Sequence, residues 1–389
     1  MSYSGSVMVL NGESKVALDV VRCLGRCGLR VMVGSYDPNA RCFSSRYCQD
    51  RFLYNHQADD ESRHRAILQA LYRFHPEVLM PIYDDTYRLI LARADEYRGS
   101  VRLILPDDLR LFDFCNDKEA VTRFAGAHET PIPLTFYPQD HGELEGLRYQ
   151  LPYPVVVKPR NEAGGRGITQ LDGPQCFDDW LKNLKEGRGE PYPIIQEFVP
   201  GEDLEITLIV DHDRLLGATV DRVLQNYPFP YGPPIACETI RDDEIVQTYF
   251  RLLRAFSCRG IAHIDLRRDA RDGRAKMIDF NPRLGGSSGV SIRAGVPLPY
   301  ILYQLAMGRD IAPYTDYRLI KHRWIFFQQL RHFVDSPQKA ALLKELMDVR
   351  RTTTEIDLTD PRPHFRVLAE VLKGLHNKLF ARQRLALGK

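Results

Sequence analysis

The sequence predicts a mixed α/β (α+β) fold, and three observations point to this class. In the first third of the chain, short apolar runs alternate with segments whose apolar residues recur at helical spacing. In the middle, apolar strand-like runs are separated by glycine-rich and acidic turns. The chain has 389 residues, which is too long for one ordinary hydrophobic core. We therefore expect two or three domains.

The N-terminal third is expected to form a parallel, doubly wound sheet over about residues 1–112. The expected strands are Ser6–Leu10, Val31–Gly34, Val78–Ile82 and Arg102–Leu105, and the expected helices are Val16–Cys27, Arg63–Phe74 and Thr86–Tyr97. Ligands of such sheets bind at the carboxyl ends of the strands, where the sequence places Asn11, Gly12, Glu13, Asp84 and Asp85. The turn after the first strand has a single glycine and lacks G-x-G-x-x-G, so a dinucleotide site is not expected there.

The middle of the chain is expected to combine antiparallel strands with helices. Asn116 is predicted to cap a helix over Glu119–His128. The expected strands are residues 153–158, Ile168–Leu171, Pro193–Val199, Leu204–Val210, Leu215–Val223, Gly260–Arg267 and Ala275–Phe280. The turn Asp272-Gly273 joins the last two as a hairpin. Helices are expected over Ile245–Phe256 and Leu298–Met307, and the last eighty residues are expected to be helical.

Composition narrows the classes of function. The 53 basic and 51 acidic side chains leave a formal net charge of +2, which gives no electrostatic basis for nucleic-acid binding. No apolar run approaches the roughly 20 residues that a membrane-spanning helix needs. The first residues show no basic-then-apolar signal pattern, so we expect a cytoplasmic protein.

A first candidate for chemistry is the strand end at Lys158 and the turn that follows it. The turn Glu162-Ala-Gly-Gly-Arg-Gly167 holds three glycines, so a lysine charge and bare backbone N–H groups lie close in sequence. Such groups bind polyphosphates, although the Walker A pattern is absent. The structural alternative is a glycine-rich hairpin that only turns the chain.

A second candidate is the hairpin that carries Asp265, Asp279 and Asn281. Residues two apart on a strand face the same side, so Asp279 and Asn281 are expected to face Asp265 on the antiparallel partner. Carboxylate and amide oxygens suit Mg²⁺. Solvated strand acids are the alternative, but Asp279 stands within an apolar stretch where an unpaired charge would be costly. Arg283 adds a guanidinium for a phosphoryl or carboxylate oxygen.

A third candidate is the segment Gln196-Glu197-Phe198-Val199-Pro-Gly-Glu-Asp203-Leu-Glu205, which joins an apolar strand to an acidic turn. Its backbone can hydrogen-bond a planar base while a carboxylate takes ribose hydroxyls. By itself it is equally compatible with a surface hairpin.

Taken in order, these motifs resemble those of the ATP-grasp superfamily. The run comprises Asp117-Lys118, Val-Val-Lys158-Pro, Gly164-Gly-Arg-Gly167, the segment from Gln196 to Asp203, Asp265 and Asp279-Phe-Asn281-Pro-Arg283. The chain is similar to carboxylate–amine ligases and carbamoyl-phosphate-synthase-like ligases, and its nucleotide residues also look like those of biotin carboxylases and D-alanine–D-alanine ligases. The resemblance implies a Rossmann-like pre-ATP-grasp domain over 1–112, an ATP-grasp domain over 113–310 and a helical region over 311–389. Within the ATP-grasp domain it implies a lid lobe over about 113–195 and a metal and catalytic lobe over about 196–310.

The resemblance also implies roles for individual residues. ATP would be bound by Lys118, Lys158, Gly164, Gly165, Gly167, Gln196, Glu197, Phe198, Val199 and Asp203, with Glu205 as the second choice for the ribose. Mg²⁺, for which Mn²⁺ can substitute, would be held by Asp265, Asp279 and Asn281. Lys158 and Arg283 would be catalytic, and Arg293, which follows the metal strand in sequence, is a third catalytic candidate. The family usually has Glu-x-Asn where this chain has Asp279-Phe-Asn281, so the number of metal ions is left open.

The implied activity is ADP-forming ligation of a small carboxylate to an amine through an acyl phosphate. Two alternatives remain, a kinase-type or carbamoyl-phosphate-synthase-like enzyme that phosphorylates a small carboxylate, and a binding or regulatory protein that retains ATP. Candidate substrate contacts are the loop Tyr227–Pro234, the turn Gly285-Gly-Ser-Ser-Gly289 with Arg293, and Asp84 and Asp85 for an amino group. His263 is either packed or catalytic. A homodimer is left open, and the basic segment Lys373–Lys389 is expected to pack on its own protein.

Overall fold

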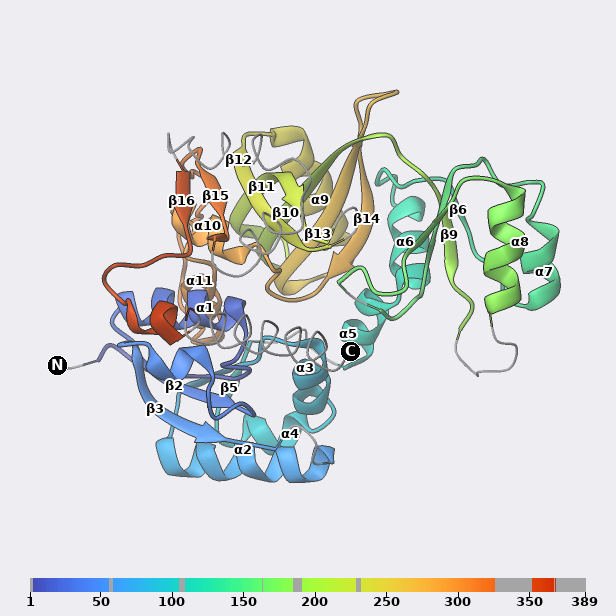
Figure 1. Cartoon of the computed structure of the whole chain (residues 1–389). Helices are drawn as coiled ribbons and strands as arrows, with labels where there is room; N and C mark the ends of the chain where they lie inside the picture. Colours follow the sequence, from blue (N-terminus) through green and yellow to red (C-terminus); the bar gives the residue numbers. More distant parts are fainter. Residues whose placement is uncertain are drawn as a thin grey trace, which may run out of the picture. The chain divides into compact units, whose positions relative to one another are not determined.

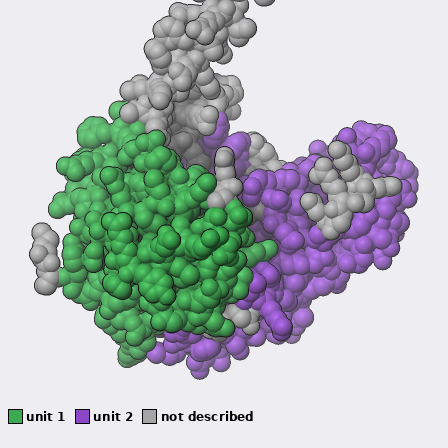
Figure 2. Space-filling model, turned by 90° about the horizontal axis from the view of Figure 1, so that it is seen from below, with its two compact units in different colours: residues 1–104, 297–310, 320–389 green, residues 105–296, 311–319 purple. Residues whose placement is uncertain are grey.

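The computed structural model of the chain describes residues 3–55, 59–104, 109–162, 164–184, 191–228, 232–325, 352–366 and 368. Two compact units make up the chain (Figure 2). Unit 1 comprises residues 1–104, 297–310 and 320–389, and unit 2 comprises residues 105–296 and 311–319. The expected boundaries, after residues 112 and 310, differ from these, because residues 297–310 and 320–389 group with the N-terminal residues.

Unit 1 contains a five-stranded sheet of strand order β3-β2-β1-β4-β5, and every pair in it is parallel. Its strands are β1 (Ser6–Val9), β2 (Arg30–Ser35), β3 (Cys48–Leu53), β4 (Val78–Met80) and β5 (Arg102–Leu103). Its helices are α1 (Lys15–Arg26), α2 (Asp60–Phe74), α3 (Asp84–Leu91), α4 (Ala94–Arg98) and α11 (Leu298–Ala306), with a 3-10 turn η1 (Arg41–Ser44). The predicted parallel α/β sheet is confirmed.

The structure of unit 1 differs from the sequence predictions in two places. Strand β3 was not predicted, because its side chains alternate between half-buried and exposed and leave no continuous apolar run. The single helix expected over Thr86–Tyr97 is broken into α3 and α4 at Ala92 and Arg93.

The sequence suggested that the C-terminal part of unit 1 is helical. This prediction was wrong for part of the segment. The described residues contain β15 (Lys321–Arg323) and β16 (Thr352–Thr354), which pair in parallel. Three consecutive β-branched threonines favour a strand. The basic segment Lys373–Lys389 lies outside the described residues.

Unit 2 contains a four-stranded antiparallel sheet of order β6-β9-β7-β8, beside which two helices lie (Figure 1). Its elements are β6 (Thr135–Phe136), β7 (Val155–Lys158), β8 (Thr169–Leu171), β9 (Ile194–Glu197), α7 (His141–Gly146) and α8 (Pro174–Asn183). Its apolar core gathers Leu144, Val155, Val157, Leu171, Phe177 and Ile195. This sheet holds Lys158 at the last position of β7.

Unit 2 also contains an antiparallel sheet in which the order is β14-β13-β10-β11-β12. Its strands are β10 (Gly201–Asp211), β11 (Arg214–Asn226), β12 (Pro234–Ile240), β13 (Arg259–Asp269) and β14 (Ala275–Asn281). The helices of this part are α5 (Leu109–Asn116), α6 (Lys118–Ala127), α9 (Asp243–Ala255) and α10 (Ser288–Ala294).

The two faces of this second sheet differ in polarity because strand side chains alternate. One face, which includes Leu204, Ile206 and Ile264, belongs to a core shared with residues of α6 and α9. The other face therefore carries the intervening polar residues of β10, β11, β13 and β14. Among the described helices of the chain, none is long and apolar enough to cross a membrane.

Candidate active site

The β13–β14 hairpin brings together the three oxygen-bearing residues that the sequence selected. Asp265 lies directly opposite Asp279, and Asn281 lies two residues further along β14. The Asp279 Oδ1 accepts the Phe280 N–H at 3.0 Å. The Arg283 guanidinium donates to the Asn281 Oδ1 at 3.2 Å. The alternation argument thus placed these side chains correctly, and Arg283 lies beside them.

Lys118 and Lys158 both reach β14 at this point. The Lys118 Nζ lies 2.9 Å from the Asp279 Oδ1 and donates to the Glu162 carbonyl at 2.8 Å. The Lys158 Nζ donates to the Ile278 carbonyl at 2.8 Å. Two ammonium groups from two separate elements therefore converge on the strand that carries Asp279.

Lys158 is buried, with only 6% of its surface exposed. Burial lowers the pKa of Lys158 to about 8, because removing the ammonium from water disfavours its charged form. The carboxylates of Asp279, Asp265 and Asp203 partly oppose this shift, while Lys118 adds to it. A buried ammonium of this kind is well suited to receive the negative charge of a phosphate.

The start of α6 is fixed by a small ion-pair network. Asp117, and not Asn116, is the N-cap, because its carboxylate accepts the N–H groups of Glu119 and Ala120. Asn116 instead ends α5, where its side chain donates to the Phe112 carbonyl at 2.9 Å. The capping prediction was one residue out, because Asn and Asp are equally good caps.

Arg160 connects this cap to the end of β7. Its guanidinium pairs with Asp117 and lies 2.9 Å from the Glu119 carboxylate. Its carbonyl accepts the Lys118 N–H at 3.1 Å. Arg160 therefore connects the start of α6, which carries Lys118, to the end of β7, which carries Lys158. The sequence motifs did not indicate this role.

The glycine turn after β7 needs its glycines. Gly164, Gly165 and Gly167 have φ values of 68°, 77° and 70°, a region that residues with a Cβ rarely adopt. A Cβ on Gly167 would also lie 2.7 Å from the ring of Pro159. The sequence interpretation of a backbone-lined turn is compatible with this geometry.

The segment expected to frame a base is already hydrogen-bonded at several points. The N–H groups of Glu197 and Phe198 donate to the carbonyls of Leu134 and Pro154, and the Val199 carbonyl accepts from Arg267. Gln196 is buried and its amide donates to the Thr135 hydroxyl at 3.2 Å.

The side chain of Glu197 is committed elsewhere. Its carboxylate lies 3.2 Å from the Lys276 Nζ and 2.9 Å from the Arg271 guanidinium. Burial would raise the pKa of Glu197, but hydrogen bonds from the Leu134 N–H, Arg271 and Lys276 outweigh burial and lower it. Any contact of Glu197 with a base therefore falls to its backbone.

The two candidate ribose ligands occupy different surroundings. Asp203 is half-buried, pairs with Arg267 and accepts from the Asn226 amide at 3.4 Å. Glu205 is 5% exposed and its Oε1 lies 3.8 Å from the His263 Nε2. Asp203 is therefore the accessible carboxylate of the pair.

Glu205 and His263 belong to a row of polar side chains that crosses the sheet. The strand register aligns Asp221, Glu205, Asp265 and Asp279 on four successive strands. Burial would lower the pKa of His263, but its hydrogen bond to Asp265 and the nearby Glu205 outweigh burial and raise it. Burial raises the pKa of Asp221 well above its ordinary value, and the Glu205 carboxylate adds to that shift.

Arg293, which we predicted to be catalytic, lies on α10. Its guanidinium donates to the Gly289 carbonyl of the same helix at 3.1 Å. Gly285, at the start of the preceding turn, approaches His263 so closely that a Cβ there would lie 2.4 Å from the imidazole ring. The turn thus contacts the polar face, whereas the guanidinium of Arg293 hydrogen-bonds a carbonyl of its own helix.

Other candidate substrate contacts are placed only in part. In the loop Tyr227–Pro234, residues 229–231 lie outside the described residues, and the Tyr227 N–H donates to the Pro233 carbonyl at 3.1 Å. In unit 1, Asp85 pairs with Arg63 at 2.5 Å, which already matches its charge.

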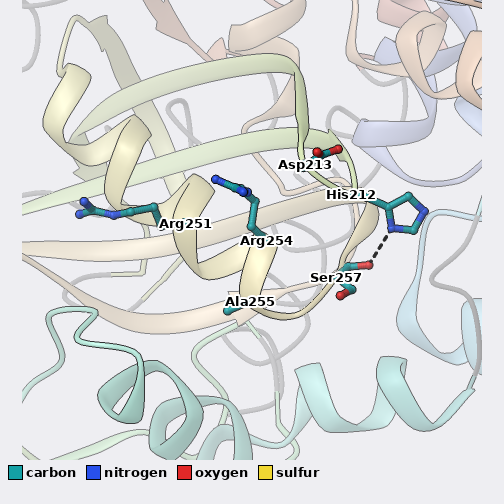
Figure 3. A pocket seen from close by; sticks show the side chains of 6 residues that line it. All are labelled: His212, Asp213, Arg251, Arg254, Ala255 and Ser257. Atoms are coloured by element: carbon teal, nitrogen blue, oxygen red, sulfur yellow. Dashed lines mark hydrogen bonds between the residues drawn. The ribbon is translucent and has the colours of Figure 1, made fainter.

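A surface hollow of about 390 Å³ lies between the β10–β11 turn and the end of α9 (Figure 3). His212, Asp213, Arg251, Arg254, Ala255 and Ser257 line it. The His212 Nδ1 lies 3.2 Å from the Ser257 carbonyl. None of the predicted site residues lines this hollow, so it contributes nothing to the candidate site.

Residues 115–287 match the family model of the ATP-grasp domain. This segment begins just before α6 and ends just after β14, so it contains both lysines and the three oxygen-bearing residues. Residues 115–287 are an ATP-grasp domain. The predicted family resemblance is confirmed.

Two curated relatives and one solved structure are similar to this chain. D-aspartate ligase of Enterococcus faecium (strain Aus0004) is 26% identical over 198 residues, which are 46% of this chain and 47% of that enzyme. The large chain of carbamoyl phosphate synthase from Thermotoga petrophila is 26% identical over 177 residues, which are 43% of this chain and 16% of that protein. The match thus spans less than half of either relative.

The solved structure is L-amino acid ligase from Bacillus licheniformis. It superimposes with a TM-score of 0.60 at 17% identity and covers 79% of this chain and 75% of that chain. At this identity the likeness concerns the fold. It extends well beyond the ATP-grasp domain and agrees with the mixed α/β class.

Proposed function

We propose that this chain is an ATP-dependent carboxylate–amine ligase that forms ADP through an acyl phosphate. The observation that carries the proposal is the convergence on β14, where the Lys118 Nζ lies 2.9 Å from Asp279 and the Lys158 Nζ binds the adjacent carbonyl at 2.8 Å. Two buried cations beside two carboxylates and an amide form a site for a metal-bound polyphosphate. The similarity to D-aspartate ligase favours an amino acid or a related amine as one substrate.

The donor set fits Mg²⁺. Asp265 and Asp279 face each other across the hairpin, and Asn281 supplies an amide oxygen on the same side. Hard oxygen donors of this kind are what Mg²⁺ prefers, and Mn²⁺ accepts the same set. Bound by these three residues, the ion would neutralise charge on the phosphates. Asp279 is shorter than the usual glutamate, and its Oδ1 is shared with Lys118.

The residues of this chain would act mainly by positioning and by neutralising charge. Lys118 and Lys158 would hold the phosphates of ATP, while Arg283 would steady the transferring phosphoryl group. The carboxylate substrate attacks the γ-phosphorus, and the bond from that phosphorus to the bridging oxygen of ADP breaks. The amine then attacks the acyl carbon, phosphate leaves, and the amine loses a proton. The turn with Gly164, Gly165 and Gly167 would keep water from the acyl phosphate.

A second candidate rests on the similarity to carbamoyl phosphate synthase, which favours an enzyme that phosphorylates a small carboxylate. The two candidates differ in what phosphate release requires. A ligase releases phosphate only when both a carboxylate and an amine are present. The alternative enzyme consumes ATP with the carboxylate alone and yields a phosphorylated product.

The decisive experiment is a screen of amino-acid pairs scored by phosphate release, with mass spectrometry of the nucleotide and the products. We expect ADP, phosphate and a new amide. Asp279→Asn should abolish the signal. Asp272→Asn, in the exposed turn of the same hairpin, is the matched control and should retain it. AMP formation, or equal activity of the two variants, would contradict the proposal.

Two finer expectations accompany the proposal. A homodimer is tested by the molar mass from light scattering of the purified chain. Substitution of Mg²⁺ by Mn²⁺ is tested in the same phosphate-release assay.

A further inference from the structure

We propose that the polar sheet face of unit 2 carries a second cation site, in which Glu205, His263 and Asp265 bind a divalent transition metal such as Zn²⁺. One donor atom from each residue lies within 4.8 Å of the others. This site goes beyond the proposed ligase function, since it needs neither ATP nor a substrate. It adjoins the predicted Mg²⁺ ligands through Asp265.

The distances between the donor atoms suit a small ion. The His263 Nε2 lies 3.3 Å from the Asp265 Oδ1 and 3.8 Å from the Glu205 Oε1. Donors bound to Zn²⁺ at about 2.0–2.2 Å in a tetrahedron lie about 3.4 Å apart. The three atoms are thus close to the spacing that a shared ion imposes, and a fourth position is left for another ligand.

The imidazole of His263 is held in the orientation that a metal ligand needs. Its Nδ1 lies 3.0 Å from the Thr207 Oγ1, and both residues are buried. If that nitrogen carries the proton and donates to the hydroxyl, the Nε2 presents its lone pair toward the two carboxylates. Gly285 also fixes the ring, because only a residue without a Cβ fits against it.

Asp221 supplies an independent observation. It is 1% exposed, and neither of its carboxylate oxygens has a hydrogen-bond partner among the described residues. The strand register puts it directly opposite Glu205 and on the same face. A buried carboxylate without a partner is costly unless a cation compensates it. A divalent ion bound by Glu205 and His263 would provide that compensation, with Asp221 outside the group of three ligands.

The chemistry of the donors separates this site from the Mg²⁺ site. Asp279 and Asn281 offer only oxygen, which suits Mg²⁺. A site that includes imidazole favours Zn²⁺ or Co²⁺ over Mg²⁺. The two sites therefore respond to different substitutions, although Asp265 is common to both.

The test is a titration of the chelator-treated full chain with Co²⁺ and with Zn²⁺ in the absence of nucleotide. We expect one Co²⁺ per chain, visible by its absorption bands and displaced by Zn²⁺. Asp279→Asn should bind Co²⁺ as the wild type does. His263→Gln and Glu205→Gln should lose at least about 100-fold in affinity, and Thr207→Val about 10-fold.

Proton NMR of the Co²⁺ form gives a readout that a structural role would not change. The His263 Nδ1–H should appear as a strongly shifted, exchangeable resonance that disappears in D₂O and is absent from His263→Gln. Circular dichroism checks that each variant is folded. If His263→Gln does not fold, Thr207→Val, which replaces a hydroxyl by a methyl group, is the test variant.

Three results would overturn the site. They are a wild type that binds no Co²⁺, a Co²⁺ signal that Asp279→Asn removes, and a signal that survives in His263→Gln. The first result would mean that a protonated His263 bridges Glu205 and Asp265. Loss of ATP binding in Asp279→Asn with Co²⁺ binding retained would separate this site from the proposed function.

Discussion

The two ends of the β13–β14 hairpin hold charged residues in opposite ways. At the turn end, Asp269 and Glu197 face Lys276 and Arg271. The Lys276 Nζ lies 2.7 Å from Asp269 and 3.2 Å from Glu197, and Arg271 lies 2.6 Å and 2.9 Å from the same two carboxylates. Two acids are matched by two bases, so this end is a closed structural cluster.

At the other end of the hairpin, acidic side chains form a row on the polar face and outnumber the lysines that reach it. Asp221, Glu205, Asp265 and Asp279 lie in one row across four strands, with Lys118 near Asp279. Lys158 adds a buried ammonium whose hydrogen bond goes to a carbonyl. Strands of the same sheet thus carry a matched cluster and an acid-rich one. The difference teaches that the cluster of matched charges has a structural role, whereas the acid-rich row beside the two lysines is where we propose that cations and phosphates bind.

Replacing Lys158 is expected to have the largest effect on ATP turnover. We expect Lys158→Met to lower kcat/KM for ATP by about 100-fold or more, because a buried charge that faces phosphate is lost. Thermal stability should change little or rise, since the variant no longer buries an ammonium. Steady-state kinetics and differential scanning calorimetry measure the two quantities.

Lys276→Met is the matched control for Lys158→Met. It removes an ammonium from the closed cluster, so it should lower stability and leave nucleotide affinity intact. Equal loss of ATP turnover in Lys158→Met and Lys276→Met would contradict the assignment of a structural role to one end of the hairpin and of nucleotide binding to the other.

Replacing Asp269 should lower the stability of the fold and leave ATP turnover unchanged, which is the reverse of the effect expected for Lys158→Met. Asp269 is 1% exposed and accepts hydrogen bonds from Arg271 and Lys276. Asp269→Asn should lower the free energy of unfolding by about 2 kcal/mol, because hydrogen bonds to a charged group are lost. Urea denaturation measures this change. A variant of unchanged stability but reduced turnover would show that the closed cluster takes part in the reaction.

Acid should remove the contribution of Asp269 to the free energy of unfolding. Hydrogen bonds from Arg271, and then from Lys276, hold the pKa of Asp269 well below its ordinary value. The unfolded chain therefore binds the proton first, and the stabilisation is complete above about pH 4. It is lost as the pH falls from about 4 toward 2. The stability difference between the wild type and Asp269→Asn should accordingly shrink over that range. A constant difference would contradict the assignment.

Much of the architecture was predictable because it is encoded locally. Alternating apolar residues and the Asp272-Gly273 turn predicted the hairpin, and period two then put Asp279 and Asn281 on the face of Asp265. These inferences need only residues that are close in sequence. The resemblance to the ATP-grasp family likewise rested on short motifs and on their order along the chain.

What the sequence missed depends on pairing between distant segments. Glu197 meets Lys276 across 79 residues, and Arg160 meets Asp117 across 43. Asp221 becomes a neighbour of Glu205 only through the register of β10 and β11. No local pattern marks such partners, because they are set by how strands align and not by spacing along the chain.

The smallest expected effect concerns Asp203, which combines the two roles compared above: it forms an ion pair, and it is proposed to bind a ligand. It pairs with Arg267, yet it is more accessible than Glu205 and remains the proposed ribose ligand. Asp203→Asn should raise KM for ATP by about 10-fold and change kcat little, because a hydrogen bond to a charged group contributes about 1.5 kcal/mol to binding.

Comparison with 2′-deoxy-ATP sharpens this last prediction. If Asp203 binds the ribose hydroxyls, the wild type should discriminate against the deoxy nucleotide and Asp203→Asn should discriminate less. Unchanged discrimination would mean that the Asp203 carboxylate only orients Arg267, and the residue would then belong with the matched cluster at the turn end of the hairpin.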